Sequence, residues 1–415
     1  MSGSLQNRVN LENLTLAFLI LFAAVSSSAI SLMQSAYGLA LAAWLGVIAW
    51  TRGAKGWHHN PLWLPLLALI VANVAAAVFS VEPDRSIKAI KQLALVGMVL
   101  MVGNAVGTRR QVKALALTWL GAAGVIGLYA VAQVLFGEDR ARGFFGGPMT
   151  LVRILTLAIA VAMPLAVYAP GQIRRVVACC LPPAIAALFL TYSRAGWLAS
   201  GTALLLLAGI KKNKAILTGI SLVLCGALLL AAFYPQTRTG GLIRSILQPM
   251  NATSARFYKS NLQRYWMYKS ALRIFCDYPI TGVGQRNFSE VYPDYVPEEL
   301  RDPRILRDDG RVYTGFAHAH NLYLNLLATQ GILGLGAMLW LIGAAIRLTW
   351  RNYRRHEDIF LKHLSLGIAI AMAAFLTLGA FDENSRDSES IMQLWFLMGI
   401  AVAVHRLTPE RNEHL

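Results

Sequence analysis

The chain has 415 residues, of which 56% are hydrophobic and only 14% are charged. Soluble globular domains carry about a quarter charged residues, so this composition excludes an ordinary soluble protein, and no polar stretch is long enough to form a separate soluble domain. The formal net charge of +17 would suit a nucleic-acid-binding protein, but lysine and arginine also collect in the cytoplasmic loops of membrane proteins. We therefore expect no nucleic-acid partner.

Apolar runs near 20 residues recur along the whole chain, and this is the length that a helix needs to cross a bilayer. They predict an all-α polytopic membrane protein with about twelve transmembrane helices. Only Arg8 precedes the first run and further runs follow it, so we expect a retained first helix and not a cleaved signal. The predicted spans are residues 14–32, 37–50, 62–80, 90–106, 114–136, 151–168, 176–190, 197–210, 215–233, 322–346, 364–381 and 391–404.

Basic residues mark every second loop between these runs. Lysine and arginine are retained on the cytoplasmic side, so the alternation predicts that both termini are cytoplasmic. The intervening loops, such as residues 31–36, 81–85 and 382–389, are neutral or mixed in charge and are expected on the outer face. The basic loops hold Arg52 and Lys55; Arg109, Arg110 and Lys113; Arg174 and Arg175; Lys211, Lys212 and Lys214; and Arg347, Arg351, Arg354 and Arg355.

One long polar segment, residues 234–320, falls on the outer face and divides the chain into three parts. Residues 1–233 hold the first nine predicted spans, residues 234–320 form a large, partly helical loop before the tenth span, and residues 321–415 hold the last three spans. Aromatic and apolar residues recur at helical spacing from Arg264, which predicts an amphipathic helix in this loop. A loop of this length in a compact protein is usually functional.

Two of the eight histidines, His318 and His320, fall on the outer face, where the long loop returns to the membrane. A histidine at the mouth of a helix often only binds an interfacial carbonyl. Here Asn321 and a cationic loop lie beside the pair, and imidazole is the side chain best suited to exchange a proton near neutral pH. His320 is therefore a candidate general base.

Three outer-face arginines form a second candidate group. Arg194 lies in a tight link between two spans, Arg142 lies in a glycine-rich loop, and Arg264 opens the amphipathic segment. Each could simply extend to the lipid headgroups. Several arginines that converge could instead bind a phosphate through two-point contacts.

The remaining reactive residues predict no metal site and no disulfide. The outer acidic residues lack the spacing of metal ligands, so we interpret them as parts of solvated loops. The cysteines lack both metal-ligand spacing and nearby histidines. The acidic residues are Asp308, Asp309, Asp382, Glu383, Asp387 and Glu389, and the cysteines are Cys179, Cys180, Cys225 and Cys276.

His320-Asn321, followed after nine residues by Gly331-x-x-Gly334, resembles the signature of the O-antigen ligase and polymerase superfamily. Arg194, before Ala-Gly-Trp, and Arg264, before Tyr-Trp, also resemble positions of that family, as does Pro279-Ile-Thr-Gly-Val-Gly284 downstream. The predicted topology, with a large loop before the tenth span, is similar as well.

The resemblance implies glycosyl transfer at the periplasmic face of the bacterial inner membrane. The donor would be a glycan on undecaprenyl diphosphate, and the acceptor would be a sugar hydroxyl of the lipid A core in a ligase. Neither a metal nor another cofactor is expected. We assign His320 as the base, with Arg194 and Arg264 on the departing diphosphate, which fixed guanidinium groups stabilise in place of a metal. Arg142, His318 and Asn321 are further candidate substrate-binding residues.

Direct attack without a covalent intermediate would invert the anomeric carbon. Gly331 and Gly334 are expected to be structural, because small residues allow close packing of helices beneath the site.

Other functions stay open at this point. A polymerase would transfer the glycan to a second lipid-linked chain, and a related enzyme would use a protein acceptor. The net charge of +17 and the outer arginines suit an acceptor as anionic as a phosphorylated core, which favours a ligase. A transporter of an anionic lipid-linked substrate would need charged residues inside its spans. The predicted spans hold very few charged residues away from their ends, and Lys91 and Arg153 both lie near the outer ends of their spans.

Overall fold

The structure is a computed structural model that describes residues 2–51, 60–212, 255–296 and 318–408. The regular secondary structure of these residues is entirely helical, with no strand among them. The helices are α1 Ser2–Val25, α2 Ile30–Trp50, α3 Trp63–Val78, α4 Pro83–Ile90, α5 Gly97–Ala105, α6 Arg109–Leu135, α7 Pro148–Tyr168, α8 Gly171–Leu190, α9 Arg194–Lys211, α12 Ala255–Asp277, α13 Phe288–Val291, α14 Leu322–Arg355, α15 Ile359–Gly379 and α16 Ser388–Arg406, with 3-10 turns η1 Lys91–Val96 and η2 Tyr292–Tyr295.

Eight helices in the described part are long and apolar enough to cross a membrane, which agrees with a polytopic membrane protein. Two further apolar helices, Val9–Val25 and Trp63–Val78, are shorter. The predicted span 215–233 and much of the predicted loop 234–320 lie outside the described residues. The count of about twelve spans therefore stays a prediction.

Several predicted boundaries are wrong because local turn chemistry outweighs hydropathy. The sequence predicts the second span at residues 37–50, but α2 begins at Ile30, two residues after a run of three serines. It predicts the fourth span from residue 90, but the helix begins at Pro83 and continues as η1 and α5. Proline is favoured at the first helical position, where the missing N–H is not needed.

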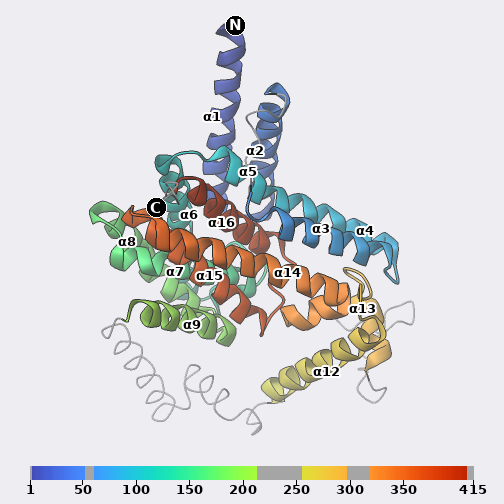
Figure 1. Cartoon of the computed structure of the whole chain (residues 1–415). Coiled ribbons are helices and arrows are strands. Elements are labelled where there is room, and N and C mark those ends of the chain that lie inside the picture. The colour runs from blue at the N-terminus through green and yellow to red at the C-terminus, as the bar shows by residue number, and fades with distance from the viewer. Residues whose placement is uncertain (1, 52–59, 213–254, 297–317, 409–415) are drawn as a thin grey trace.

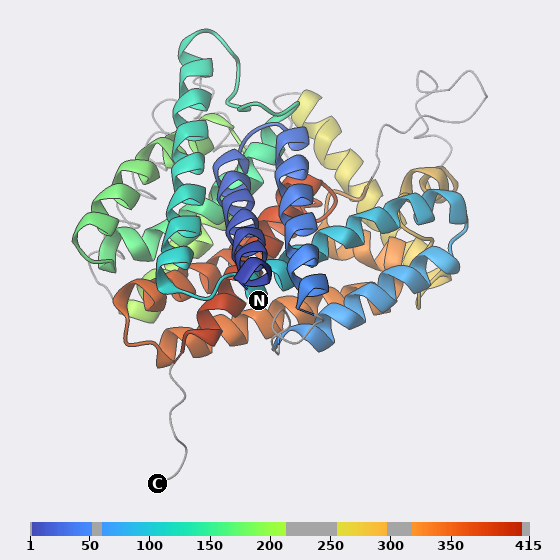
Figure 2. The same ribbon diagram turned by 90° about the horizontal axis from the view of Figure 1, so that it is seen from above.

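Three helices, α7, α15 and α16, form the centre of the molecule (Figure 1). Helix α7 packs against α15, which also packs against α14, while α16 packs against α5. Every side chain from Leu151 to Leu165 of α7 is buried, including the polar ones. Helices α1 and α2 lie side by side, as Figure 2 shows from above, and they pack on the bundle through α6 and α5.

Helix α12, the short α13 and η2 build a second, smaller core beside the start of α14. Its buried residues come from the long segment before α14 and from α14 itself: Met267, Ala271, Ile274, Val283, Phe288, Tyr292, Val296, Ala319 and Ala328. This core fixes the described part of the long loop against the helix bundle.

Helix α14 is interrupted at Gly331, whose φ of 62° and ψ of −163° are not helical. The segment after α12 packs into this break: Val283 N–H donates to Ala328 C=O at 2.9 Å, and Ile332 N–H donates to Pro279 C=O at 2.9 Å. A Cβ atom on Gly331 would lie 2.2 Å from Ile280 O, so only glycine fits. Gly331 thus has a structural role, but its close neighbour is a loop backbone and not another helix.

Candidate active site

The turn from His318 to Asn321 is held in one conformation by its own side chains. Asn321 caps α14, because its Oδ1 accepts from Leu324 N–H at 3.0 Å, and its amide donates to Ala380 C=O at 2.8 Å. His318 Nδ1 accepts from His320 N–H at 3.2 Å. His320 itself has a φ of 49°, in the left-handed region. Such a conformation is costly for a residue with a side chain and is concentrated at functional sites.

The imidazole of His320 lies against a buried carboxylate, Asp382. His320 Nδ1 is 3.2 Å from Asp382 Oδ1, and Asp382 is only 2% exposed. A carboxylate on Nδ1 favours the tautomer with the proton on that atom, which leaves Nε2 as the nitrogen that can accept one. Tyr268 of α12 donates its hydroxyl hydrogen to His320 C=O at 3.3 Å. The arrangement is that of a general base oriented by an acid.

Asp382 is itself held by Arg153, which is buried within α7. Arg153 Nη2 is 2.6 Å from Asp382 Oδ2, and the same guanidinium forms an ion pair with Asp387. The sequence-based interpretation of Asp382 and Glu383 as solvated loop residues is wrong, because both side chains are buried. A buried arginine is stable only with such partners, so the ion pairs tie the loop after α15 to α7.

The electrostatics of this group keep Asp382 ionised and His318 neutral. Burial alone would raise the pKa of Asp382, but the hydrogen bond with His320 and the ion pair with Arg153 outweigh it and hold the pKa at about 2. Burial and the neighbouring His320 lower the pKa of His318 to about 3. His318 is therefore a hydrogen-bond acceptor for the turn over the whole physiological pH range.

Arg194 and Arg264 lie close to each other at the same end of the bundle. Burial, and then the charge of Arg264, lower the pKa of Arg194. Arg194 is the first residue of α9, where Ser193 Oγ caps the helix by accepting from Gly196 N–H at 3.3 Å. Arg264 Nη1 donates to Phe381 C=O at 2.8 Å, one residue before Asp382. Arg264 thus contacts the loop that carries Asp382, and Arg194 lies within electrostatic range of Arg264.

Arg142 is held elsewhere. Its guanidinium forms an ion pair with Glu138 of the same loop at 2.5 Å, and the side chain is 45% exposed. The loop itself is anchored to the α8–α9 link, because Ala141 N–H donates to Leu190 C=O at 3.0 Å. Arg142 is therefore near the link that precedes Arg194, but the structure gives it a partner other than the His320 group.

His318, His320 and Asp382 also form a group that could hold a metal ion, with one ligand atom of each within 4.8 Å of the others. The sequence predicted no such set, because it did not bring an acidic residue to the histidines. Arg153 already neutralises Asp382, and a guanidinium on the same carboxylate disfavours a second cation. The expectation of metal-independent chemistry therefore stays a prediction that a chelator can test.

Sequence reasoning missed Asp382, Arg153 and Tyr268. One signal was available for Arg153, since an arginine inside an apolar run needs a buried partner. The partner could not be chosen, because Arg153 and Asp382 are 229 positions apart and several acidic residues were candidates.

Comparison with protein families identifies the central part of the chain. Residues 178–339 match the family model described as O-Antigen ligase. The matched range contains Arg194, Arg264 and His320, whereas Arg153 and Asp382 lie outside it. A comparison with curated proteins found no match. The match over residues 178–339 supports a member of the O-antigen ligase superfamily, and with it a glycosyl transfer of the ligase or polymerase type.

Proposed function

We propose that this protein is an O-antigen ligase that transfers a glycan from undecaprenyl diphosphate to a sugar hydroxyl of the lipid A core. The reaction takes place at the periplasmic face of the inner membrane, with both termini in the cytoplasm. The observation that carries the proposal is the pairing of His320 with the buried Asp382, beside which Arg264 binds the carbonyl of Phe381. Arg194 is near enough for the charge of Arg264 to lower its pKa, after the larger effect of burial.

In the proposed reaction, His320 Nε2 accepts the proton of the acceptor hydroxyl. Asp382 stabilises the imidazolium that forms and keeps the ring in place. The acceptor oxygen attacks the anomeric carbon of the donor sugar while the bond from that carbon to the diphosphate oxygen breaks. Because no covalent intermediate is formed, the anomeric configuration is inverted.

The departing diphosphate gains negative charge as its bond to the sugar breaks. Arg194 and Arg264 supply two fixed guanidinium groups, and the amino-terminal end of α9 adds its partial positive charge. Their mutual repulsion is relieved when an anion lies between them, so this pair is suited to stabilise the leaving group. No metal ion is needed for that step in the proposal.

The acceptor class is the part of the proposal that most needs a direct test. The purified protein in liposomes would receive a lipid-diphosphate-linked glycan together with purified lipid A-core. A ligase attaches the glycan to the core, and the product shifts in mass by one donor glycan. If the carrier-linked glycan lengthens instead and the core stays unmodified, the protein is a polymerase. Movement of the donor across the bilayer without transfer would support a transporter.

A further inference from the structure

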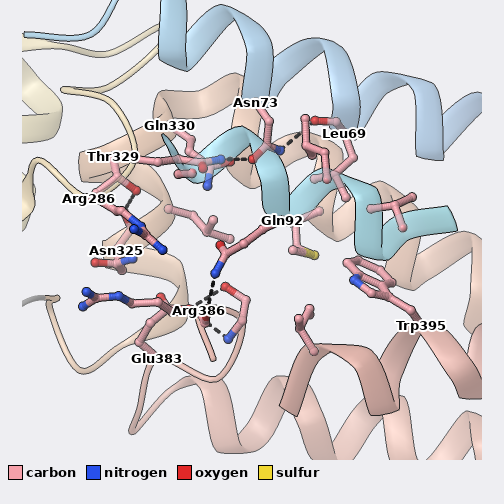
Figure 3. A pocket seen from close by; sticks show the side chains of 18 residues that line it. Leu69, Asn73, Gln92, Arg286, Asn325, Thr329, Gln330, Glu383, Arg386 and Trp395 are labelled. Atoms are coloured by element: carbon pink, nitrogen blue, oxygen red, sulfur yellow. Dashed lines mark hydrogen bonds between the residues drawn. The ribbon is translucent and has the colours of Figure 1, made fainter. Parts of the chain in front are cut away.

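A cavity of about 100 Å³ lies beside the His320 group and is separate from the proposed diphosphate site (Figure 3). Side chains of α3, η1, the loop after Gly284, the first turns of α14 and the loop before α16 line it. Neither His320 nor Arg194 nor Arg264 is among its lining residues, so these three do not share this cavity. Its polar lining includes Asn73, Gln92, Arg286, Asn325, Glu383 and Arg386.

Two arginines, Arg286 and Arg386, bring positive charge to this cavity. Burial lowers the pKa of Arg386, the charge of Asp387 opposes this shift, and the nearby Arg286 lowers the pKa further. In the described part of the chain neither guanidinium makes a hydrogen bond or an ion pair, and the nearby Asp387 is engaged by Arg153. Figure 3 shows the two side chains on the same side of the cavity. The charged ends of both arginines are therefore available to hydrogen-bond an anion in the cavity.

The backbone holds both arginines in place without using their charged ends. Gln92 Nε2 donates to Arg386 C=O at 3.0 Å. Arg286 has a φ of 65° and lies two residues after Gly284, where a Cβ atom would lie 2.1 Å from the Cβ of Ser80. The segment before Arg286 therefore packs closely beside the end of α3. Two guanidinium groups on anchored backbones are suited to bind a phosphate or carboxylate.

The cavity also offers hydrogen-bond acceptors. Glu383 is 1% exposed, and its Oε1 accepts from Ser385 N–H at 2.9 Å, but Oε2 has no partner in the described structure. The side-chain oxygen of Gln330, which also lines the cavity, is likewise buried without a partner. A ligand with hydroxyl donors beside an anionic group would bind both the arginines and the acceptor oxygens of the cavity. A phosphorylated or carboxylated sugar has that chemistry.

The cavity shares a wall with the His320 group. Asn325 Oδ1 accepts from Ala319 N–H, between the two histidines, at 3.2 Å, and Glu383 directly follows Asp382. Arg194 and Arg264 belong to α9 and α12, whereas the cavity is built by α3, η1, α14 and the loop before α16. In an inverting transfer, the nucleophile and the leaving group lie on opposite sides of the anomeric carbon, so an anionic group on the acceptor would bind at a site separate from the diphosphate site.

We propose that this cavity binds an anionic group, a phosphate or a carboxylate, on the acceptor sugar and so presents the neighbouring hydroxyl to His320. This inference rests on the proposed ligase function and extends it to the choice of acceptor. Arg286 and Arg386 bind the anion, and Glu383 accepts from a sugar hydroxyl.

The test is a steady-state measurement with Arg286→Gln, Arg386→Gln and the matched control Arg273→Gln, an exposed arginine of the same outer segment. Three core acceptors are used: untreated, dephosphorylated and carboxyl-reduced. We expect both cavity variants to raise KM for the untreated acceptor about tenfold or more, the size of a lost charge-assisted contact. KM for the donor should stay within about twofold, and the control should match the wild type.

The acceptor that abolishes the difference from wild type identifies the anion as phosphate or carboxylate, and either result supports the proposal. An equal rise with all three acceptors, a rise for the donor alone, or no rise overturns it. If a glutamine variant fails to fold, Arg286→Lys and Arg386→Lys replace it. Their KM for the untreated acceptor should rise less, because lysine keeps the charge but not the two-point contact.

A second experiment separates this inference from the proposed function. Thermophoresis measures the binding of the untreated core lipid to the protein in the absence of donor. If the wild type transfers no glycan but binds the core in an Arg286-dependent manner, the ligase proposal fails and the cavity assignment stands. If the wild type transfers glycan and the cavity variants bind and react normally, the cavity assignment fails alone.

Discussion

Two groups of arginines at the same end of the molecule differ in how their charge is compensated. Arg153 is buried and forms ion pairs with Asp382 and Asp387. Arg286 and Arg386 line a cavity and have no such partner in the described residues. A compensated arginine holds other residues in place, because its charge is already used. A pair of arginines whose guanidinium groups form no ion pair is instead available to a ligand.

This difference predicts that substitutions in the two groups impair different properties, fold stability in one and substrate affinity in the other. Changes in the compensated group should affect the orientation of His320 and the stability of the fold. Changes at Arg286 and Arg386 should affect substrate affinity and leave the fold intact. The following substitutions test this separation, in order of decreasing expected effect.

Removal of the proposed base should give the largest loss of activity. We expect His320→Ala to lower kcat by about 100- to 10,000-fold, the usual contribution of general base catalysis. The thermal midpoint should stay near that of the wild type, because His320 lies at a loop–helix junction and is partly exposed. His318→Ala should have a milder effect. Transfer at the wild-type rate by His320→Ala would rule out the general-base role.

Removal of the buried arginine should mainly unfold the protein. Arg153→Met leaves the Asp382 carboxylate buried without its ion pair, which costs about 3–5 kcal/mol. The thermal midpoint in detergent, measured beside Arg109→Gln as an exposed control, should fall clearly for Arg153→Met only. An unchanged midpoint would show that the ion pairs do not hold the loop after α15.

Glu383 should make stability depend on pH. Burial raises its pKa to about 7 from an ordinary value of 4.5, so the folded protein binds the proton more tightly than the unfolded chain. The stability from this proton is complete below pH 4.5 and is lost as the pH rises to about 7. Glu383→Gln imitates the protonated form, so its free energy of unfolding should match that of the wild type below pH 4.5 and exceed it at pH 8, by up to about 3 kcal/mol. Equal free energies of unfolding at pH 8 would contradict this.

The contribution of Arg194 and Arg264 to activity should depend on the geometry of the guanidinium group as well as on its charge. We expect Arg194→Lys and Arg264→Lys each to lose most of the activity, about tenfold, because an ammonium group cannot make the two-point contact of a guanidinium. The loss should include weaker donor binding, measured by titration with the lipid-linked donor. If both lysine variants keep near-normal rates, the arginines only attract the substrate and do not bind the leaving group.

Removal of metal ions should have no effect. Arg194 and Arg264 are proposed to stabilise the diphosphate in place of a metal, so full activity is expected in excess EDTA. The control is a metal-dependent glycosyltransferase assayed in the same buffer. Loss of activity with EDTA and recovery with Zn²⁺ would instead indicate a metal site at His318, His320 and Asp382, whose ligand atoms are close enough to hold an ion.

Much of the fold and part of the candidate site were predictable because they depend on local features. A run of about 20 apolar residues must be helical to cross a membrane, wherever it packs. His320, Arg194 and Arg264 could be singled out because few side chains of their type fall in the outer loops. The boundaries at Ile30 and Pro83 were missed, since hydropathy averages over the turn residues that set them.

The helical class, the apolar runs and the residue types available for chemistry could be predicted from the sequence, because each depends on neighbours along the chain. Which charged residues form ion pairs became clear only from the packing of the helices. Arg153 meets Asp382 because α7 packs against α15, and Arg286 meets Arg386 because the loop before α14 packs at the break in that helix. Pairing across hundreds of residues depends on packing in three dimensions, and a local pattern carries no information about it.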